Sequence, residues 1–165
     1  MTKELPVRVL FVCVANVCRS PAAEAVMNVQ LNKKNLTDFI ECDSVGTMVY
    51  NRGEPADHRV RNLGKKRGYE VESKTRRFDE VADFMAYDYI FVMDDAVYND
   101  LKQLANEDIY DKKIFHITDF CCKKGTEKNL LDPYAKGKED FESLFDILEV
   151  AIDGIIKKIV KENNF

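Results

Sequence analysis

A cysteine and an arginine stand six positions apart near the start of the chain, and a serine follows the arginine directly. Cys13 is followed by the segment Val14-Ala15-Asn16-Val17-Cys18, and then by Arg19 and Ser20. A cysteine thiolate is a strong nucleophile, and a guanidinium can hold two oxygens of a phosphate-like anion at once. A neighbouring hydroxyl can stabilise the thiolate by donating a hydrogen bond. We therefore expect Cys13 to attack an oxyanion that Arg19 binds.

The residues on either side of this segment predict the elements that position it. Val7 to Val12 form a nearly continuous apolar run rich in β-branched residues, which is typical of a strand buried on both faces. Ser20 and Pro21 are residue types that begin helices, and good helix formers continue from Ala22 to Leu31. A loop between a strand and a helix N-terminus can direct several backbone N–H groups at one anion.

The rest of the chain continues the alternation of strands and helices. Further strands are predicted at 39–44, 87–93 and 113–117, with helices at 57–67 (before Gly68) and from Asp94-Asp95 to about Leu104. A polar surface loop is expected over 118–138, and apolar residues at helical spacing from Phe141 to Ile159 predict an amphipathic C-terminal helix. The expected fold class is α/β: a single domain over 1–165, in three layers, with a central four-stranded parallel sheet and helices on both faces.

Composition limits the partners and the compartment. No stretch approaches the roughly 20 apolar residues of a membrane span, and the first twelve residues do not resemble a leader. A net charge of −4 argues against nucleic-acid binding, so the basic residues of 59–67 are interpreted as a solvated helix surface. We expect a monomer without metal or cofactor.

The five cysteines indicate a reducing, cytoplasmic location, because an odd number cannot all pair in disulfides. Cys42 falls in a predicted strand and is expected in the core. Cys121 and Cys122 are interpreted as exposed thiols or adventitious metal ligands.

The loop resembles the phosphate loop of the low-molecular-weight protein tyrosine phosphatase family, whose signature is C-x-G-N-x-C-R-S-P. Cys13, Asn16, Cys18, Arg19, Ser20 and Pro21 match this signature, and Ala15 stands where the family usually has glycine. The pair Asp43-Ser44, the stretch from Tyr87 to Asp94 and the triplet Asp132-Pro133-Tyr134 extend the resemblance over nearly the whole chain.

The resemblance implies hydrolysis of phosphotyrosine and aryl phosphate monoesters in substrate proteins, through a phosphocysteine on Cys13. Arg19 would bind the phosphate or another oxyanion, and Asp132 would be the general acid and base. Asn16 and Ser44 would hold the loop in shape.

The same resemblance implies that Tyr50 and Tyr134 are the aromatic walls of the substrate pocket. Cys18 would protect an oxidised Cys13 by forming a disulfide with it, which predicts redox regulation.

Two residues of the loop bear on activity and specificity. If Ala15 needs a positive φ, the backbone there would be strained by about 1 kcal/mol or somewhat more. A protein arginine phosphatase shares the loop but typically has threonine where this chain has Val17, so valine favours phosphotyrosine.

Two other classes remain as alternatives. An arsenate reductase of the same fold needs two further cysteines in mid-chain, where this sequence has none between Cys42 and Cys121. A non-catalytic phosphoprotein-binding module is the last alternative, and it would leave the cysteine, arginine, serine and aspartate together unexplained.

Overall fold

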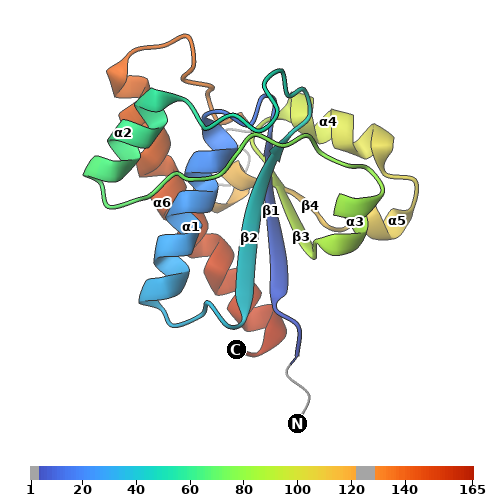
Figure 1. Cartoon of the computed structure of the whole chain (residues 1–165). Coiled ribbons are helices and arrows are strands. Elements are labelled where there is room, and N and C mark those ends of the chain that lie inside the picture. Colours follow the sequence, from blue (N-terminus) through green and yellow to red (C-terminus); the bar gives the residue numbers. More distant parts are fainter. Residues whose placement is uncertain (1–3, 122–128) are drawn as a thin grey trace.

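A parallel four-stranded sheet forms the centre of the computed structural model, which describes residues 4–121 and 129–165 (Figure 1). The strands are β1 (Val7–Cys13), β2 (Ile40–Gly46), β3 (Tyr89–Val92) and β4 (Ile114–His116), in the order β2-β1-β3-β4. The second strand, β2, therefore lies on one side of β1, and the later strands β3 and β4 lie on the other side. The loop after β1 lies at this change of direction, where open α/β sheets bind ligands.

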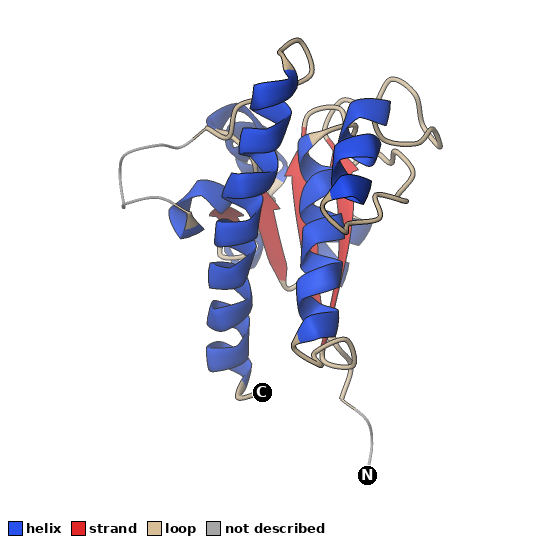
Figure 2. Ribbon diagram, turned by 90° about the vertical axis from the view of Figure 1, so that its left-hand side faces the viewer, coloured by secondary structure: helices blue, strands red, loops and turns tan. Residues whose placement is uncertain are grey.

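Helices cover both faces of the sheet, as Figures 1 and 2 show. On one face lie α1 (Arg19–Lys33), α2 (His58–Lys66) and α6 (Lys138–Asn163), and on the other lie α3 (Ala82–Ala86), α4 (Asp95–Leu104) and α5 (Asp108–Asp111). The side chains of β1 alternate between the two layers: Val9 and Phe11 join the cluster under α1 and α6, whereas Leu10 and Val12 join the cluster under α4. The predicted fold class is confirmed.

The long helix α6 forms most of one layer. Its buried residues are Phe141, Leu144, Phe145, Leu148, Ala151, Ile152, Ile155, Ile156 and Ile159. They recur at three- and four-residue steps, so one stripe of the helix faces the sheet and α1. The predicted amphipathic helix is confirmed, with an earlier start at Lys138.

Several boundaries predicted from the sequence are wrong. The strand expected at 87–93 is shorter, because Tyr87 ends the short helix α3 and pairing begins only at Tyr89. Neither α3 nor α5 was predicted, since each has at most five residues and no hydrophobic period. The expected loop at 118–138 overlaps a 3₁₀ helix, η1 (Ile117–Phe120), and its central part lies outside the described residues.

In the part of the chain that the structure describes, no helix combines the length and apolarity needed to cross a membrane.

Candidate active site

The loop between β1 and α1 surrounds the sulfur of Cys13 with hydrogen-bond partners. The Sγ atom lies 2.9 Å from the Oγ atom of Ser20 and accepts the backbone N–H of Asn16 at 3.3 Å. Cys13 is 3% exposed. The loop then enters the N-terminus of α1 at Arg19, and the first turn of this helix contains no acidic residue to neutralise its positive end. The backbone N–H groups at this helix N-terminus form a site suited to an anion beside the sulfur.

The side chain of Asn16 makes three hydrogen bonds that join the loop to two other segments. Its Nδ2 atom donates to Ser20 Oγ at 2.8 Å and to Ser44 Oγ at 3.1 Å, and its Oδ1 atom accepts the backbone N–H of Arg76 at 2.9 Å. Its φ of 59° is left-handed, a conformation that asparagine tolerates better than most residues. The structure thus brings Asn16, Ser20 and Ser44 together.

A glycine on the neighbouring strand lets the loop pack closely. Gly46 pairs with Cys13 at the ends of β2 and β1. A Cβ atom at Gly46 would lie 2.5 Å from the carbonyl oxygen of Val14 and 2.9 Å from the backbone of Ala15.

Ala15 itself is not among the described residues with positive φ, so the strain considered for this position does not arise.

Arg19 is anchored by an acidic residue from the end of β3. Its Nη1 atom donates to Asp94 Oδ2 at 2.7 Å and to the carbonyl oxygen of Leu130 at 2.9 Å. The Arg19 side chain is 3% exposed, whereas Asp94 is 17% exposed. Because Nη1 is engaged in this way, Nε and Nη2 remain the groups available to an anion. The Nη2 atom lies 3.7 Å from Asp132 Oδ2, so the structure brings Arg19 and Asp132 together.

A pocket of about 330 Å³ opens above the loop. It is lined by Val14, Ala15, Val17, Tyr50, Asn51, Asp132 and Tyr134. Both tyrosines are exposed, at 77% for Tyr50 and 57% for Tyr134, so their rings are open to a ligand. The structure places the two expected aromatic walls and the expected acid around a single pocket.

Residues at the start of α2 fix the segment that carries Asp132. Asp57 caps α2, and its backbone N–H donates to the carbonyl oxygen of Val17 in the loop. Its carboxylate binds the guanidinium of Arg59, which also donates to the carbonyl oxygen of Tyr134 at 2.7 Å. The Arg59 hydrogen bonds hold the pKa of Asp57 below its usual range. Arg59 therefore links the loop to the segment of the expected acid.

The interpretation of 59–67 as a wholly solvated basic surface is wrong for two of its arginines. Arg59 binds Asp57, and Arg67 crosses to α6, where it binds Asp146 at 2.8 Å and Glu149 at 3.4 Å.

The other cysteines differ in their surroundings. Burial, together with the charge of Asp57, raises the pKa of the Cys18 thiol far above its usual range. Cys42 is only partly buried, and its sulfur approaches Asn28 Oδ1 at 3.3 Å. Cys121 donates to the carbonyl oxygen of Thr118, and Cys122 lies outside the described residues. Among the described residues, no three histidine, cysteine or acidic side chains gather in a way that could hold a metal.

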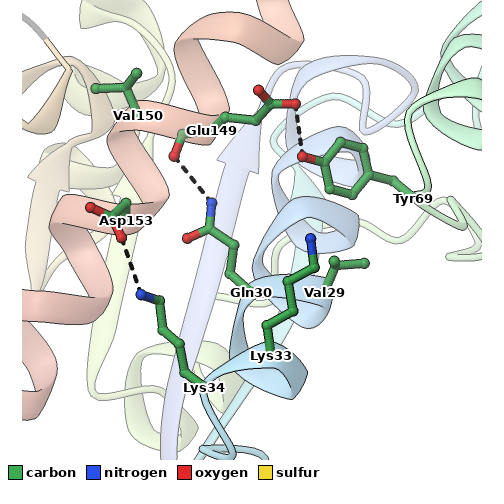
Figure 3. A pocket seen from close by; sticks show the side chains of 8 residues that line it. All are labelled: Val29, Gln30, Lys33, Lys34, Tyr69, Glu149, Val150 and Asp153. Atoms are coloured by element: carbon green, nitrogen blue, oxygen red, sulfur yellow. Dashed lines mark hydrogen bonds and ion pairs between the residues drawn. The ribbon is translucent and has the colours of Figure 1, made fainter.

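A larger cavity, of about 690 Å³, lies between α1 and α6 (Figure 3). Most of its polar side chains already bind one another: Lys34 pairs with Asp153, while Gln30 and Tyr69 both donate to Glu149. None of the expected site residues lines it, so the pocket above the loop is the candidate active site.

Comparison with known proteins agrees with the geometry. The model of the family described as low molecular weight phosphotyrosine protein phosphatase matches residues 8–164. The chain belongs to this family. Membership assigns it to the protein tyrosine phosphatase class of enzymes.

Individual named proteins and solved structures resemble the chain over nearly its full length. The low molecular weight phosphotyrosine protein phosphatase of Saccharomyces cerevisiae is 35% identical, with 96% of this chain and 99% of the yeast protein covered. A crystal structure of a protein tyrosine phosphatase from Entamoeba histolytica, with Hepes in the active site, is 42% identical with a TM-score of 0.88, covering 96% and 99% of the two chains. The Vibrio vulnificus protein Wzb, solved in complex with benzylphosphonate, is 27% identical with a TM-score of 0.78, covering 92% and 98%.

Sequence reasoning missed four residues that support the site: Asp94, Asp57, Arg59 and Gly46. Asp94 was noted only as part of a family motif and as an acidic helix start. Its place at the carboxyl end of a strand was the available signal, because that is the edge where the loop lies. Arg59 and Gly46 act through contacts between distant segments, for which the sequence offers no local signal.

Proposed function

We propose that the protein hydrolyses phosphotyrosine and aryl phosphate monoesters through a phosphocysteine on Cys13. The observation that carries this proposal is the buried sulfur of Cys13, which accepts the Asn16 N–H and touches the Ser20 hydroxyl below an open pocket. The proposed reaction uses the thiolate, the form of cysteine that attacks phosphorus.

In the first step, the Cys13 thiolate attacks phosphorus as the bond between phosphorus and the phenolic oxygen breaks. Arg19 and the backbone N–H groups of the loop bind the equatorial oxygens, on which charge accumulates. The protonated carboxyl of Asp132 gives its proton to the departing phenolate. The distance of 3.7 Å between Arg19 Nη2 and Asp132 Oδ2 supports this assignment, since the carboxylate lies next to the guanidinium.

In the second step, water attacks the phosphocysteine. The Asp132 carboxylate, now without its proton, takes one from the water as the sulfur–phosphorus bond breaks. Inorganic phosphate leaves, and Cys13 is again a thiolate. No cofactor takes part in either step.

The pocket supports an aromatic substrate. Tyr50 and Tyr134 can pack against a phenyl ring, and the pocket of about 330 Å³ leaves room for one. Wzb of Vibrio vulnificus has been solved with benzylphosphonate, an aromatic ring attached to a phosphate-like group. We therefore place phosphotyrosine-containing proteins ahead of phosphoarginine proteins as substrates, consistent with Val17 in the loop.

A reducing, cytoplasmic compartment is part of the proposal, since the nucleophile must remain a free thiol. Cys18 is buried in the same loop, five positions after Cys13. When hydrogen peroxide oxidises Cys13 to a sulfenic acid and is itself reduced to water, the Cys18 sulfur would displace the sulfenic oxygen as a second water to form a disulfide, which a cellular thiol would later reduce.

The deciding experiment compares wild type, Cys13→Ser and Asp132→Ala on p-nitrophenyl phosphate, phosphotyrosine, phosphoarginine and arsenate. We expect wild type to cleave phosphotyrosine, Cys13→Ser to be inactive, and Asp132→Ala to be slowed roughly a hundredfold or more. Cleavage of phosphoarginine alone, or reduction of arsenate, would replace the proposed activity with that alternative. Binding of phosphopeptides without hydrolysis would indicate a binding module.

A further inference from the structure

A cavity of about 280 Å³ lies between α2 and the beginning of α6, beside the active site. Its lining consists of His58, Arg59, Asn62, Leu63, Lys66, Lys136, Lys138 and Phe141. We call this cavity the lysine groove. Four of its described lining residues are lysine or arginine, a fifth is histidine, and none is acidic.

Three of the cations in the lysine groove are not neutralised. Within residues 4–121 and 129–165, no carboxylate lies within 4.0 Å of the amino groups of Lys66, Lys136 or Lys138. Arg59 differs, because Asp57 holds it. In a protein with a net charge of −4, three free ammonium groups around one cavity form a local region of opposite sign that attracts anions.

Two acidic residues next to the groove in sequence, Glu139 and Asp140, lie in the first turn of α6, and a third, Asp57, pairs with Arg59. Asp140 accepts the backbone N–H of Gly137 at 3.2 Å as part of the helix cap, and Glu139 is exposed. Neither lines the groove. The groove therefore keeps its positive character, and the side chains of Leu63 and Phe141 give it an apolar lining.

The lysine groove adjoins the substrate pocket through Arg59 and Tyr134. The Arg59 guanidinium lies 5.5 Å from the ring centre of Tyr134, which lines the substrate pocket, and 4.7 Å from that of Phe141, which lines the groove. A turn closed by the Lys136 N–H and the carbonyl oxygen of Pro133, at 2.8 Å, connects Tyr134 to Lys136. A peptide whose phosphotyrosine ring rests on Tyr134 would therefore bring neighbouring residues to the groove.

We propose that the lysine groove binds acidic side chains flanking the phosphotyrosine of a protein substrate, so that the enzyme prefers acidic phosphopeptides. This inference rests on the proposed phosphatase activity and narrows its substrate class. Exposed ion pairs are individually weak, so the preference comes from several lysines acting together.

The test measures kcat/KM for two matched phosphotyrosine peptides. One carries Asp and Glu on both sides of the phosphotyrosine, and the other carries Asn and Gln at the same positions. We expect wild type to prefer the acidic peptide roughly threefold to thirtyfold at low salt, and less at high ionic strength. The triple variant Lys66→Gln/Lys136→Gln/Lys138→Gln should lower this ratio to about one.

A matched variant removes the same charge elsewhere: Lys33→Gln/Lys65→Gln/Lys112→Gln. Lys65 precedes Lys66 in α2 but does not line the groove, and Lys33 lines the cavity of Figure 3. This control should keep the wild-type ratio.

The proposal is overturned if wild type shows no preference, if the groove variant keeps it, or if both variants lose it equally, which would indicate an effect of net charge. Hydrolysis of p-nitrophenyl phosphate by wild type distinguishes failure of the groove proposal from failure of the proposed phosphatase activity. If wild type fails on this small substrate, it is the proposed activity that is wrong.

Discussion

Replacing Gly46 by alanine tests whether close packing of β2 against the catalytic loop sets the loop geometry. The added Cβ atom would lie 2.5 Å from the carbonyl oxygen of Val14, whereas ordinary van der Waals contact begins at 3.4 Å. The contacting atoms belong to the loop backbone, so no flexible side chain can move away. The loop or the strand must shift by about 0.9 Å, the difference between these two distances.

Such a shift acts on the residues that hold the phosphate. A misplacement of about 1 Å at a catalytic group can reduce the rate roughly a hundredfold, and overpacking of a buried site costs about 1–3 kcal/mol of stability. We therefore expect Gly46→Ala to lower kcat/KM for p-nitrophenyl phosphate by roughly two orders of magnitude, with a smaller loss in the free energy of unfolding.

Gly137→Ala is the matched control, because no atom lies within 4 Å of its added Cβ and its φ of −88° suits alanine. Its stability should change by no more than about 1 kcal/mol in either direction, because alanine suits this φ but is a poorer helix N-cap than glycine, and its activity should stay close to wild type. Urea denaturation and steady-state kinetics measure both quantities. If Gly46→Ala keeps kcat/KM within about threefold of wild type, the reasoning about the loop is refuted.

Three further substitutions test the groups around the site. Asp94→Asn should lower the free energy of unfolding by roughly 1–3 kcal/mol in urea denaturation, because the buried guanidinium of Arg19 loses its carboxylate contact at 2.7 Å and keeps only that of Asp132 at 3.7 Å. Arg59→Gln should slow phenyl phosphate more than p-nitrophenyl phosphate in steady-state assays, because the segment carrying the general acid loses its hydrogen bond and poor leaving groups need that acid most. The stability of wild type, measured as the midpoint of urea denaturation, should fall between about pH 5 and pH 8, and Glu24→Gln should abolish this fall. Burial, with the hydrogen bond and charge of Asp43, raises the pKa of Glu24 from 4.5 to about 8, so the folded protein holds a proton that the unfolded chain has released and loses this stabilisation as pH rises.

Each of these expectations has a result that contradicts it. A loss below about 1 kcal/mol in Asp94→Asn would mean that the ion pair does not stabilise the fold. Equal slowing of both substrates by Arg59→Gln would exclude a role for Arg59 in positioning the acid. The control is Arg67→Gln, which removes contacts between α2 and α6 and should leave the ratio of the two rates unchanged. A slope with pH that persists in Glu24→Gln would assign the titration to another group.

Local patterns were sufficient to predict the sheet and the long helices. The apolar run before Cys13 indicated a strand buried on both faces, and its side chains do alternate between the two clusters of the core. The spacing of Cys13 and Arg19 between a strand and a helix predicted a loop that connects β1 to the N-terminus of α1. These features depend on residues close together in the sequence.

The contacts that shape the site join segments far apart in the chain. Asp94 binds Arg19 across 75 positions, and the Arg76 N–H reaches Asn16 across 60. The close approach of Gly46 to Val14 depends on the pairing of β1 with β2, and a glycine ending a strand is unremarkable in the sequence itself. Such contacts follow only from the assembled fold.

The central claim is that catalysis proceeds through a phosphocysteine on Cys13. The most direct test mixes Asp132→Ala with p-nitrophenyl phosphate, quenches the reaction in acid and locates bound phosphate by peptide mass spectrometry. Because p-nitrophenolate leaves readily without an acid, the intermediate should form, while its hydrolysis is slowed by the missing base. We predict a phosphoryl group on Cys13 and none in Asp132→Ala/Cys13→Ser. Phosphate on a different residue, or continued hydrolysis by Cys13→Ser alone, would contradict the account.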